Sequence, residues 1–401
     1  MYRNIIAAFL FLAGCRSLDS SKIFPDDFQE RRDQITGVIE IKVSNSVKSL
    51  KGNLVYPRST QMDGSLRTVA IKDWTSGFFP GVLWYTLELT NNDEFKNSAE
   101  KWTEGLSPIQ FYTGSHDIGF MINCSFGNGY RLTKNEEYHT VLLQAANTLM
   151  KRYKPAVGAI RSWDHGTDKW QYPVIIDNMM NLELLFWASK NGGTRQMYDL
   201  ALQHAEKTMA NSFRPDGSTF HVINYDSANG NVLSKETHQG FANSSCWARG
   251  QSWAIYGFTM AYRFTKSEKF LETAQKAADY FITHLPADKV PYWDFNAPNI
   301  PDEPRDASAA AIAASALLEL GTYGDDPILK KKYYSEGIAI LQSLFSPYYF
   351  NENSKSLGLL NHAVGNKPKN DEVNVSMIYG DYYFLEGLIR SKNYENKFAD
   401  K

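Results

Sequence analysis

The sequence predicts an all-α fold, an (α/α)6 barrel (six-hairpin toroid) of twelve helices that alternate between an inner and an outer ring. Helical periodicity recurs in twelve segments, whereas the alternation that marks strands is scarce and short, as at residues 218–226. The segments also alternate in kind: one is amphipathic and charged, and the next is apolar or built of small residues on most sides. The first kind is typical of helices with one solvated face, and the second of helices buried all round.

No Pro- or Ser-rich linker divides the predicted helices, so we expect a single domain over residues 28–395. An α-solenoid of helix pairs is the competing architecture, but the pairs share no regular period, which favours the closed barrel. The expected outer helices span residues 28–49, 93–105, 134–152, 194–211, 267–285 and 326–346. The expected inner helices span residues 76–90, 115–130, 176–191, 248–265, 305–321 and 375–391.

Composition narrows the classes of function. The chain has 401 residues, of which 43% are hydrophobic, enough for the core of one large barrel. Its net charge is −2, from 42 basic and 44 acidic residues, and it has no long basic run. We therefore expect no nucleic-acid partner, and an anionic substrate would have to be held by local cations.

The N-terminus is predicted to be a targeting segment. Residues 1–15 contain one Arg, an apolar run too short to span a bilayer, and then Leu-Ala-Gly-Cys, which resembles a bacterial lipobox with Cys15 as the lipidated residue. Residues 16–27 would form a polar tether. This predicts a periplasmic protein whose only membrane contact is an N-terminal lipid anchor. The alternative is an ordinary signal peptide in which the cysteine is incidental.

The remaining cysteines, Cys124 and Cys246, make no disulfide framework. They are expected to be buried thiols or, alternatively, one bridge. No metal-ligand spacing, Gly-x-Ser-x-Gly turn or phosphate-binding glycine loop is present, so we expect no metal, cofactor or nucleophilic triad.

Polar and aromatic residues gather where the inner helices begin. If all inner helices run in the same direction, these residues converge at one mouth of the barrel, where helix N-termini also favour anionic ligands. They are Trp74, His116, Asp117, Asp177, Asn178, Trp247, Arg249, Gln251, Arg305 and Asp306.

Asp117 and Asp177 are the candidate catalytic residues. Each lies beside strongly apolar residues, so desolvation and mutual repulsion should raise the pKa of one of them. A carboxyl group that is partly protonated near neutral pH can act as a general acid and then as a base. The structural alternative is a helix cap or an ion-paired core aspartate.

Other candidates would bind a ligand. Gln239 can hydrogen-bond hydroxyl groups, and Arg249 can clamp a carboxylate in a bidentate fashion. Four tryptophans could stack on a sugar ring, and three histidines lie in expected loops; the alternatives are core tryptophans and ordinary surface histidines. These residues are Trp74, Trp163, Trp247, Trp253, His221, His238 and His362.

Eight motifs, in order, resemble those of the unsaturated glucuronyl hydrolases of glycoside hydrolase family 88. Each motif is weak alone, but the ordered set is specific and covers roughly residues 70–391. The motifs are WTSGFFPG (74–81), HDIGF (116–120), IIDNMMNL (175–182), THQG (237–240), WARGQSWAIYG (247–257), YWDF (292–295), RDASAAAI (305–312) and YGDYYFLEGL (379–388).

The resemblance implies an (α/α)6 barrel without a cofactor, acting on an oligosaccharide with a 4,5-unsaturated uronic acid at its non-reducing end. The vinyl ether is hydrated, with a proton added at C4 and water at C5, and the hemiketal then opens with loss of the glycosidic bond. By motif, Asp177 is the proton donor and activates the water, and Asp117 is the second essential acid. The substrate contacts would come from Trp74, His116, Trp163, His221, His238, Gln239, Trp247, Arg249, Trp253, His362 and Lys367.

Two positions bear on specificity. Members of the family that favour sulfated ends resemble one another in an Arg before the QG pair and in a Ser-x-x-Ser-x-Lys run. Here His238 precedes Gln239, and the loop at 362–367 retains only Lys367. We therefore expect unsulfated or lightly sulfated chondroitin, hyaluronan or heparin fragments. The alternatives are an unsaturated rhamnogalacturonyl hydrolase acting on pectin fragments and a non-catalytic glycan-binding lipoprotein.

Overall fold

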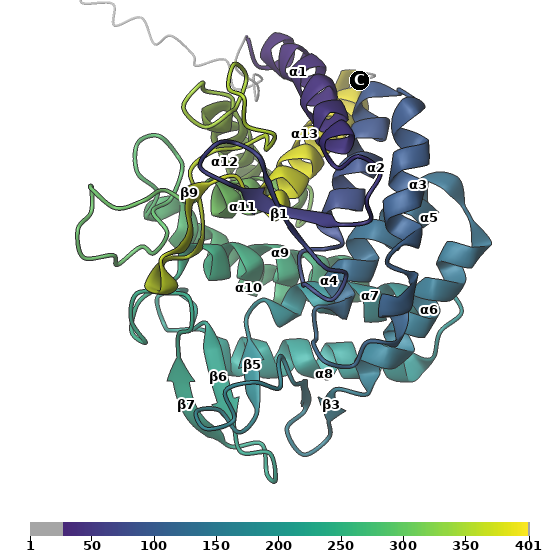
Figure 1. Cartoon of the computed structure of the whole chain (residues 1–401). Coiled ribbons are helices and arrows are strands. Elements are labelled where there is room, and N and C mark those ends of the chain that lie inside the picture. The colour runs from purple at the N-terminus through teal and green to yellow at the C-terminus, as the bar shows by residue number, and fades with distance from the viewer. Residues whose placement is uncertain (1–26, 400–401) are drawn as a thin grey trace, which may run out of the picture.

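Helices form two concentric layers in the computed structural model, which describes residues 27–399 (Figure 1). The outer helices are α1 (Phe28–Ser49), α3 (Glu94–Glu104), α6 (Glu136–Met150), α8 (Arg195–Ser212), α10 (Glu268–Thr283) and α12 (Pro327–Leu344). The inner ring consists of α2 (Phe78–Thr90), α4 (Ile118–Ile122), α5 (Asn128–Thr133), α7 (Asn178–Lys190), α9 (Ala248–Thr265), α11 (Ala307–Leu320) and α13 (Ile378–Ala399). One predicted inner helix is divided, because the π-helical turn η2 (Asn123–Gly127) joins α4 to α5.

The inner ring is closed. Going round it, α2 contacts η2, α4 contacts α7, and α9, α11 and α13 follow in chain order until α13 packs against α2. An open solenoid would leave its first and last helix pairs apart, so this contact decides between the two predicted architectures. The barrel is the predicted one.

Sequence explains the two kinds of helix. In α11 every residue from Ala307 to Leu318 is buried, and its small side chains let α9 and α13 pack closely on either side. In the outer helix α10 the buried residues recur every three or four positions, and charged residues fill the other face. The side chain of Asp306 caps α11 by accepting hydrogen bonds from the amides of Ser308 and Ala309.

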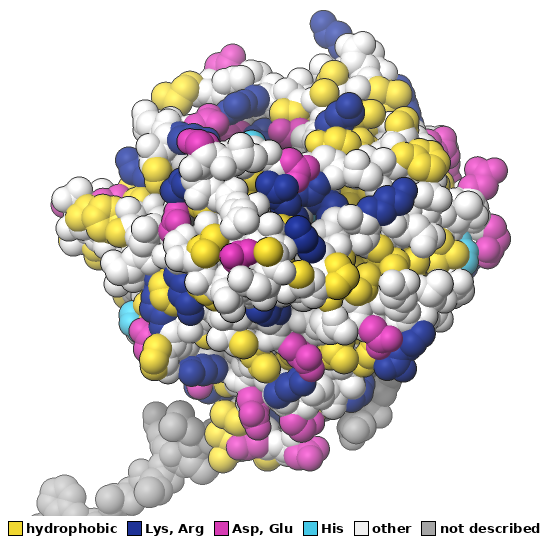
Figure 2. All heavy atoms as spheres, turned by 90° about the horizontal axis from the view of Figure 1, so that it is seen from below, with side chains coloured by type: hydrophobic (Ala, Val, Ile, Leu, Met, Phe, Trp, Pro, Cys, Tyr) yellow, Lys and Arg dark blue, Asp and Glu magenta, His cyan; other side chains and the backbone are white. Residues whose placement is uncertain are grey.

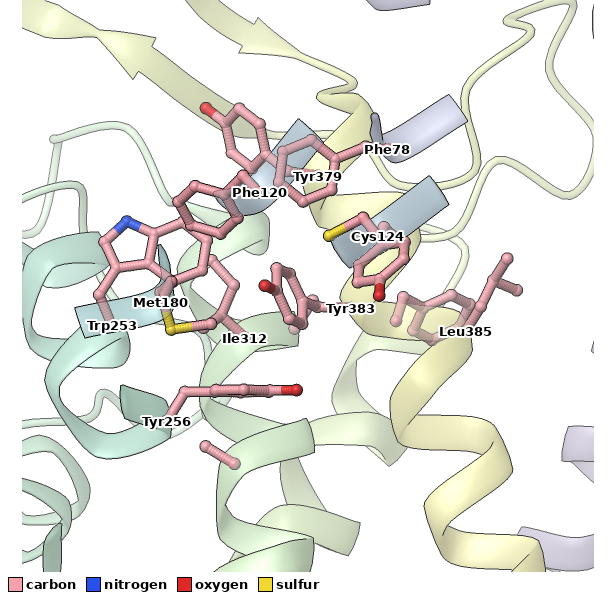
Figure 3. Close-up of a cluster of buried hydrophobic side chains, with 14 of the residues drawn as sticks. Phe78, Phe120, Cys124, Met180, Trp253, Tyr256, Ile312, Tyr379, Tyr383 and Leu385 are labelled. Carbon is pink, nitrogen blue, oxygen red and sulfur yellow. The ribbon is translucent and has the colours of Figure 1, made fainter. Parts of the chain in front are cut away.

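Apolar and aromatic side chains from the inner helices fill the axis of the barrel (Figure 3). Phe120 and Tyr379 lie on the side of one cavity, and Tyr256 on the side of another at the opposite end. Cys124 belongs to this core, and both Cys124 and Cys246 are buried free thiols, so the alternative of a disulfide is excluded.

Short antiparallel hairpins and one three-stranded sheet decorate the segments that lead into inner helices. The predicted strand at 218–226 is real but shorter, covering only β6. The strands are β1 (Tyr56–Thr60) with β2 (Leu66–Val69), β3 (Tyr153–Lys154) with β4 (Ala159–Ile160), β5 (Pro173–Ile175) with β6 (Val222–Tyr225) and β7 (Val232–Glu236), and β8 (Ala363–Asn366) with β9 (Asp371–Val375). Two 3-10 turns, η1 (Ser107–Phe111) and η3 (Lys367–Lys369), complete the described elements.

Within residues 27–399, no helix has the length and apolar character needed to cross a bilayer. The predicted signal segment 1–15, the lipidated Cys15 and nearly all of the tether 16–27 lie outside the described residues.

Candidate active site

A cavity of about 440 Å³ opens at the end of the barrel where the inner helices begin. Trp74 precedes α2, Asp117 and Asp177 immediately precede α4 and α7, and Arg249 and Tyr379 lie in the first turns of α9 and α13. All five line the cavity. The inner helices therefore run in the same direction and deliver these side chains to one mouth, as the order of residues predicts.

Close packing of α4 against α7 sets the two aspartates in place. A Cβ atom at Gly119 would lie 2.6 Å from Asn181, so only glycine permits this approach. Both Asp117 and Asp177 occupy the N-cap position of their helices, yet neither side chain caps its helix. The alternative of a structural cap therefore fails for both residues, in contrast to Asp306.

Asp117 is held from two sides. The Ser115 hydroxyl donates to Oδ2 at 2.8 Å, and His116 Nε2 lies 3.2 Å from Oδ1. Burial lowers the pKa of His116, so the imidazole is neutral at neutral pH. Hydrogen bonds of this kind favour the ionised carboxylate, and Asp117 is thus suited to carry a negative charge.

Asp177 has the opposite environment. Burial raises its pKa to about 7, the nearby Arg249 cation opposes the rise, and the Asp117 charge adds to it. Its Oδ2 atom is buried, and no hydrogen-bond partner for it lies within the described part of the chain. A group with this pKa can donate a proton and take one back near neutral pH.

Two of the four predicted tryptophans face the cavity. Trp74 stacks on Tyr379 with ring centroids 5.0 Å apart, and Trp163 stacks on His165, also at 5.0 Å. Trp247 and Trp253 lie behind the lining: Trp247 stacks on His221 at 4.4 Å, and Trp253 packs against Phe120 in the core (Figure 3).

Comparison with known proteins identifies the chain. Residues 49–319 match the model of Glycosyl Hydrolase Family 88. The chain belongs to this family. An unsaturated glucuronyl hydrolase from Formosa agariphila is 48% identical over 343 residues, which cover 84% of this chain and 85% of that protein. An unsaturated chondroitin disaccharide hydrolase from Streptococcus pneumoniae is 33% identical, covering 87% of this chain and 90% of that protein.

Solved structures agree with the family match. The crystal structure of an unsaturated glucuronyl hydrolase specific for heparin is 42% identical, has a TM-score of 0.88, and covers 92% of this chain and 98% of its own. The predicted family, barrel fold and glycoside hydrolase class are therefore confirmed. Neither the rhamnogalacturonyl hydrolase nor the non-catalytic binding protein is favoured.

In this family 88 enzyme the guanidinium of Arg249 is hydrogen-bonded to acceptors of the protein itself. Its side chain is 1% exposed, its Nη1 atom donates to Asp306 at 3.1 Å and to the carbonyl of Val364, and its Nη2 atom donates to the carbonyl of Gly365 at 2.7 Å. Through these contacts the guanidinium fastens β8 over the site. The bidentate clamp on a substrate carboxylate stays a prediction. The side-chain amide of Gln239 also holds β8, because one of its N–H groups donates to the carbonyl of Gly365 at 3.1 Å. Gln239 and His238 both line the cavity.

Besides Trp247 and Trp253, three more predicted binding residues lie outside the lining: His221, His362 and Lys367. His362 stacks on Tyr348 with centroids 4.1 Å apart, beside a different hollow. Lys367 opens the turn η3, and Lys369, two residues later, reaches the cavity in its place. The turn changes the direction of successive side chains, which the sequence alone did not reveal.

Gln251 and Arg305 also point away from the cavity of the family 88 enzyme. The Gln251 amide donates to the carbonyls of Gly217 and Ala277. Arg305 donates to the carbonyl of Val290 and pairs with Asp288. Both residues lie near the start of an inner helix, as predicted, but their side chains are on the side that faces away from the cavity.

Several lining residues were missed by sequence reasoning. They are Arg58, Lys72, Asp73, Tyr112, Ser115, His165, Lys369, Asp371 and Tyr379. Asp73 and Ser115 adjoin a motif and Tyr379 begins one, which is the signal that could have found these three. Within residues 27–399, neither Lys72 nor Lys369 has an ion-pair partner, so both are available to an anionic ligand.

Neither sign of charge dominates the chain, which has 42 basic and 44 acidic residues. Figure 2 shows acidic and basic side chains interspersed over the face that it presents, with a group of Lys and Arg near the centre. Among residues 27–399, no three His, Cys, Asp or Glu side chains are grouped so that they could hold a metal ion.

Proposed function

We propose that this enzyme is an unsaturated glucuronyl hydrolase that removes the 4,5-unsaturated uronic acid from the non-reducing end of glycosaminoglycan oligosaccharides made by lyases. The observation that carries the proposal is Asp177, a buried carboxyl group with a pKa of about 7 beside the ionised Asp117. Both lie in a cavity bordered by the stacked rings of Trp74 and Trp163.

The reaction begins at the double bond. Protonated Asp177 gives its proton to C4, and the C4=C5 electron pair forms the new C–H bond. Positive charge then develops at C5 and the ring oxygen. Water adds at C5 and loses a proton to the Asp177 carboxylate, which restores the acid. The hemiketal opens, the anomeric carbon becomes a hemiacetal, and the glycosidic oxygen leaves with a proton. Because the chemistry occurs at C4 and C5, the usual spacing rule for paired glycosidase carboxylates does not apply.

Asp117 serves this cycle as a fixed negative charge. Burial is the main cause of the raised pKa of Asp177. Asp117, held by Ser115 and lying beside His116, raises that pKa further, so Asp177 is partly protonated near neutral pH. Asp117 also presents a carboxylate to the sugar hydroxyl groups.

The substrate is anionic, and two lysines suit it. Lys72 and Lys369 both line the cavity, and the charge of Lys369 acts on His165 and His238, whose ring centroids are 6.4 Å apart. With His238 in place of an arginine, the site offers few strong sulfate ligands. We therefore propose unsulfated or lightly sulfated chondroitin, hyaluronan or heparin-type disaccharides as substrates.

The first test is the loss of ultraviolet absorbance of the conjugated C4=C5 uronate. Wild-type enzyme should bleach the band of an unsaturated chondroitin disaccharide, and Asp177→Asn should not. Rates on unsulfated and 6-sulfated disaccharides should then be compared. An intact band across several unsaturated disaccharides would refute the proposal, and a large preference for the sulfated one would refute the substrate assignment.

The N-terminal segment supports a further part of the proposal. The apolar run followed by Leu-Ala-Gly-Cys would make the enzyme a lipoprotein anchored through Cys15 and facing the periplasm. In a Gram-negative host, Cys15→Ser should abolish incorporation of labelled fatty acid and move the enzyme out of the detergent phase. Equal labelling of both forms would argue against the anchor.

A further inference from the structure

We infer that His221 is a positioning residue of the reaction: the backbone of residues 238–239 fixes its tautomer, and its Nε2–H then holds the inner oxygen of Asp177. The proton that reaches the substrate accordingly resides on the other oxygen, Oδ1. This rests on the proposed function and deepens it. It differs from the prediction that His221 binds the substrate, because His221 is 3% exposed and lies behind the residues that line the cavity.

The tautomer follows from two backbone donors. The amides of His238 and Gln239 both point at His221 Nδ1, at 3.2 and 3.3 Å. A backbone N–H is always a donor, so Nδ1 must be the unprotonated acceptor nitrogen. Burial lowers the pKa of His221 well below its usual value, so the ring is neutral. A neutral imidazole carries one N–H, which must therefore be on Nε2.

The ring has little freedom to turn. Trp247, at the start of α9, stacks on it with centroids 4.4 Å apart and planes 29° apart. A half-turn about the Cβ–Cγ bond would put the Cδ2–H group in place of Nδ1, opposite the two backbone donors, and lose both hydrogen bonds. The imidazole is thus clamped between the 238–239 backbone and the indole of Trp247.

The fixed N–H faces the catalytic acid. His221 Nε2 lies 3.7 Å from Asp177 Oδ2, and both are buried atoms without a hydrogen-bond partner among the described residues. Trp253 Nε1 is buried and unpartnered in the same way, and this indole also favours the ionised form of Asp177. Unpaired buried polar atoms are rare, and three around one carboxyl group need an explanation.

The explanation is a contact completed during the reaction. Hydrogen bonds at catalytic groups are often long in the free enzyme and tighten in the complex with substrate. The Nε2–H of His221, which faces Oδ2, and the indole N–H of Trp253, which also favours the ionised form, stabilise the carboxylate as its proton leaves for C4. The cavity reaches Asp177 from the side of Oδ1, since Oδ2 is buried. The charged groups that act on Asp177 besides this pair are Asp117 and Arg249.

The arrangement also connects substrate binding to acidity. The amides that fix His221 belong to His238 and Gln239, whose side chains line the cavity. A substrate that orders this segment orders the imidazole, and with it the acid.

The experiment compares His221→Phe, which keeps the ring and loses both nitrogens, with His221→Gln, which can restore an N–H donor. A matched control is His204→Phe. His204 is also buried, accepts a backbone N–H on Nδ1, from Ile160, and lies outside the cavity lining, but among the described residues it has no polar contact with Asp177 such as His221 makes. For His221→Phe we expect kcat to fall about 10²-fold with KM changed by less than about threefold. Loss of the donor removes a hydrogen bond to the carboxylate, so the pKa of Asp177 rises and the alkaline fall in kcat/KM moves to higher pH.

Each outcome of this experiment either supports or overturns the positioning role of His221. Partial recovery of kcat and of the pH profile in His221→Gln supports the inference, as does an unshifted profile in His204→Phe. A large rise in KM with unchanged kcat would make His221 a substrate ligand and overturn it. An activity loss that follows melting temperature alone in both Phe variants would also overturn it.

A measurement without substrate separates this inference from the proposed function. Nitrogen-15 correlation spectra of the histidine rings, with His221 assigned by its loss in His221→Phe, should show a protonated Nε2 and a bare Nδ1 at pH 7. An Nδ1–H or a cationic ring would refute the inference even if the enzyme hydrolyses unsaturated disaccharides.

Discussion

Asp117 and Asp177 occupy equivalent positions, each the residue before an inner helix, yet their carboxyl groups are held in opposite ways. Asp117 accepts a hydrogen bond from Ser115 and lies 3.2 Å from His116, whereas the inner oxygen of Asp177 is buried without a partner among the described residues. Burial raises the pKa of Asp177 to about 7, whereas hydrogen bonds of the kind that Asp117 accepts favour the ionised carboxylate. Two identical side chains are thereby suited to two different tasks.

The pH dependence of the reaction should report Asp177. Its protonated form is the acid, so kcat/KM for an unsaturated disaccharide should fall above a pH of about 7, the pKa of Asp177. Asp117→Asn removes the negative charge that raises this pKa, so the fall should move to lower pH as the rate drops. If kcat/KM of Asp117→Asn falls at the same pH as that of the wild type, the two carboxyl groups do not interact.

Trp74 should contribute binding rather than chemistry. It presents its indole to the cavity while stacking on Tyr379, so Trp74→Ala removes an aromatic surface but no titratable group. We expect KM to rise about tenfold with kcat changed by less than about threefold. Phe111→Ala, at an exposed position outside the cavity lining, is the control and should leave both constants unchanged. A selective fall in kcat for Trp74→Ala would contradict this assignment.

The lysines of the η3 turn should differ in effect. Lys369 lines the cavity and Lys367 does not, although they are two residues apart. Lys369→Ser should raise KM for a 6-sulfated disaccharide about three- to tenfold, the equivalent of about 1 kcal/mol for an exposed ion pair. The matched variant Lys367→Ser should leave it unchanged. Equal effects would mean that the turn is oriented differently in solution.

Glu386 should matter for stability rather than activity. It is buried at the far end of the barrel, where it accepts hydrogen bonds from the hydroxyls of Tyr85, Tyr256 and Ser315 and pairs with Arg390 at 3.4 Å. Glu386→Gln keeps an acceptor oxygen but removes the negative charge that pairs with Arg390, whose side chain is 20% exposed, and should lower the free energy of unfolding by about 2 kcal/mol. Urea unfolding would measure this loss. A variant as stable as wild type would show that Glu319 alone compensates Arg390.

Much of the fold could be predicted because it is local. The spacing of apolar residues along a helix reports how much of its circumference is buried, so the alternation of α10-like and α11-like segments revealed two rings of helices. Asp117 and Asp177 could be placed at the site because a residue that precedes an inner helix lies at a known end of the barrel. The π-helical turn at 123–127 could not be predicted, since its sequence continues an ordinary helical pattern.

By itself, then, the sequence determined twelve helical segments, one of which the π-helical turn divides, their order in two rings, the family and the pair of candidate acids. Only the tertiary structure decided which neighbours each side chain meets. In the tertiary structure Arg249 pairs with Asp306 and binds β8, His362 stacks on Tyr348, and Lys369 rather than Lys367 lines the cavity. The same structure also buries Asp177, which raises its pKa. The physical reason is that periodicity reports which face of one helix is buried. The direction of a loop side chain and the pKa of a carboxyl group depend on atoms from segments far apart in the chain.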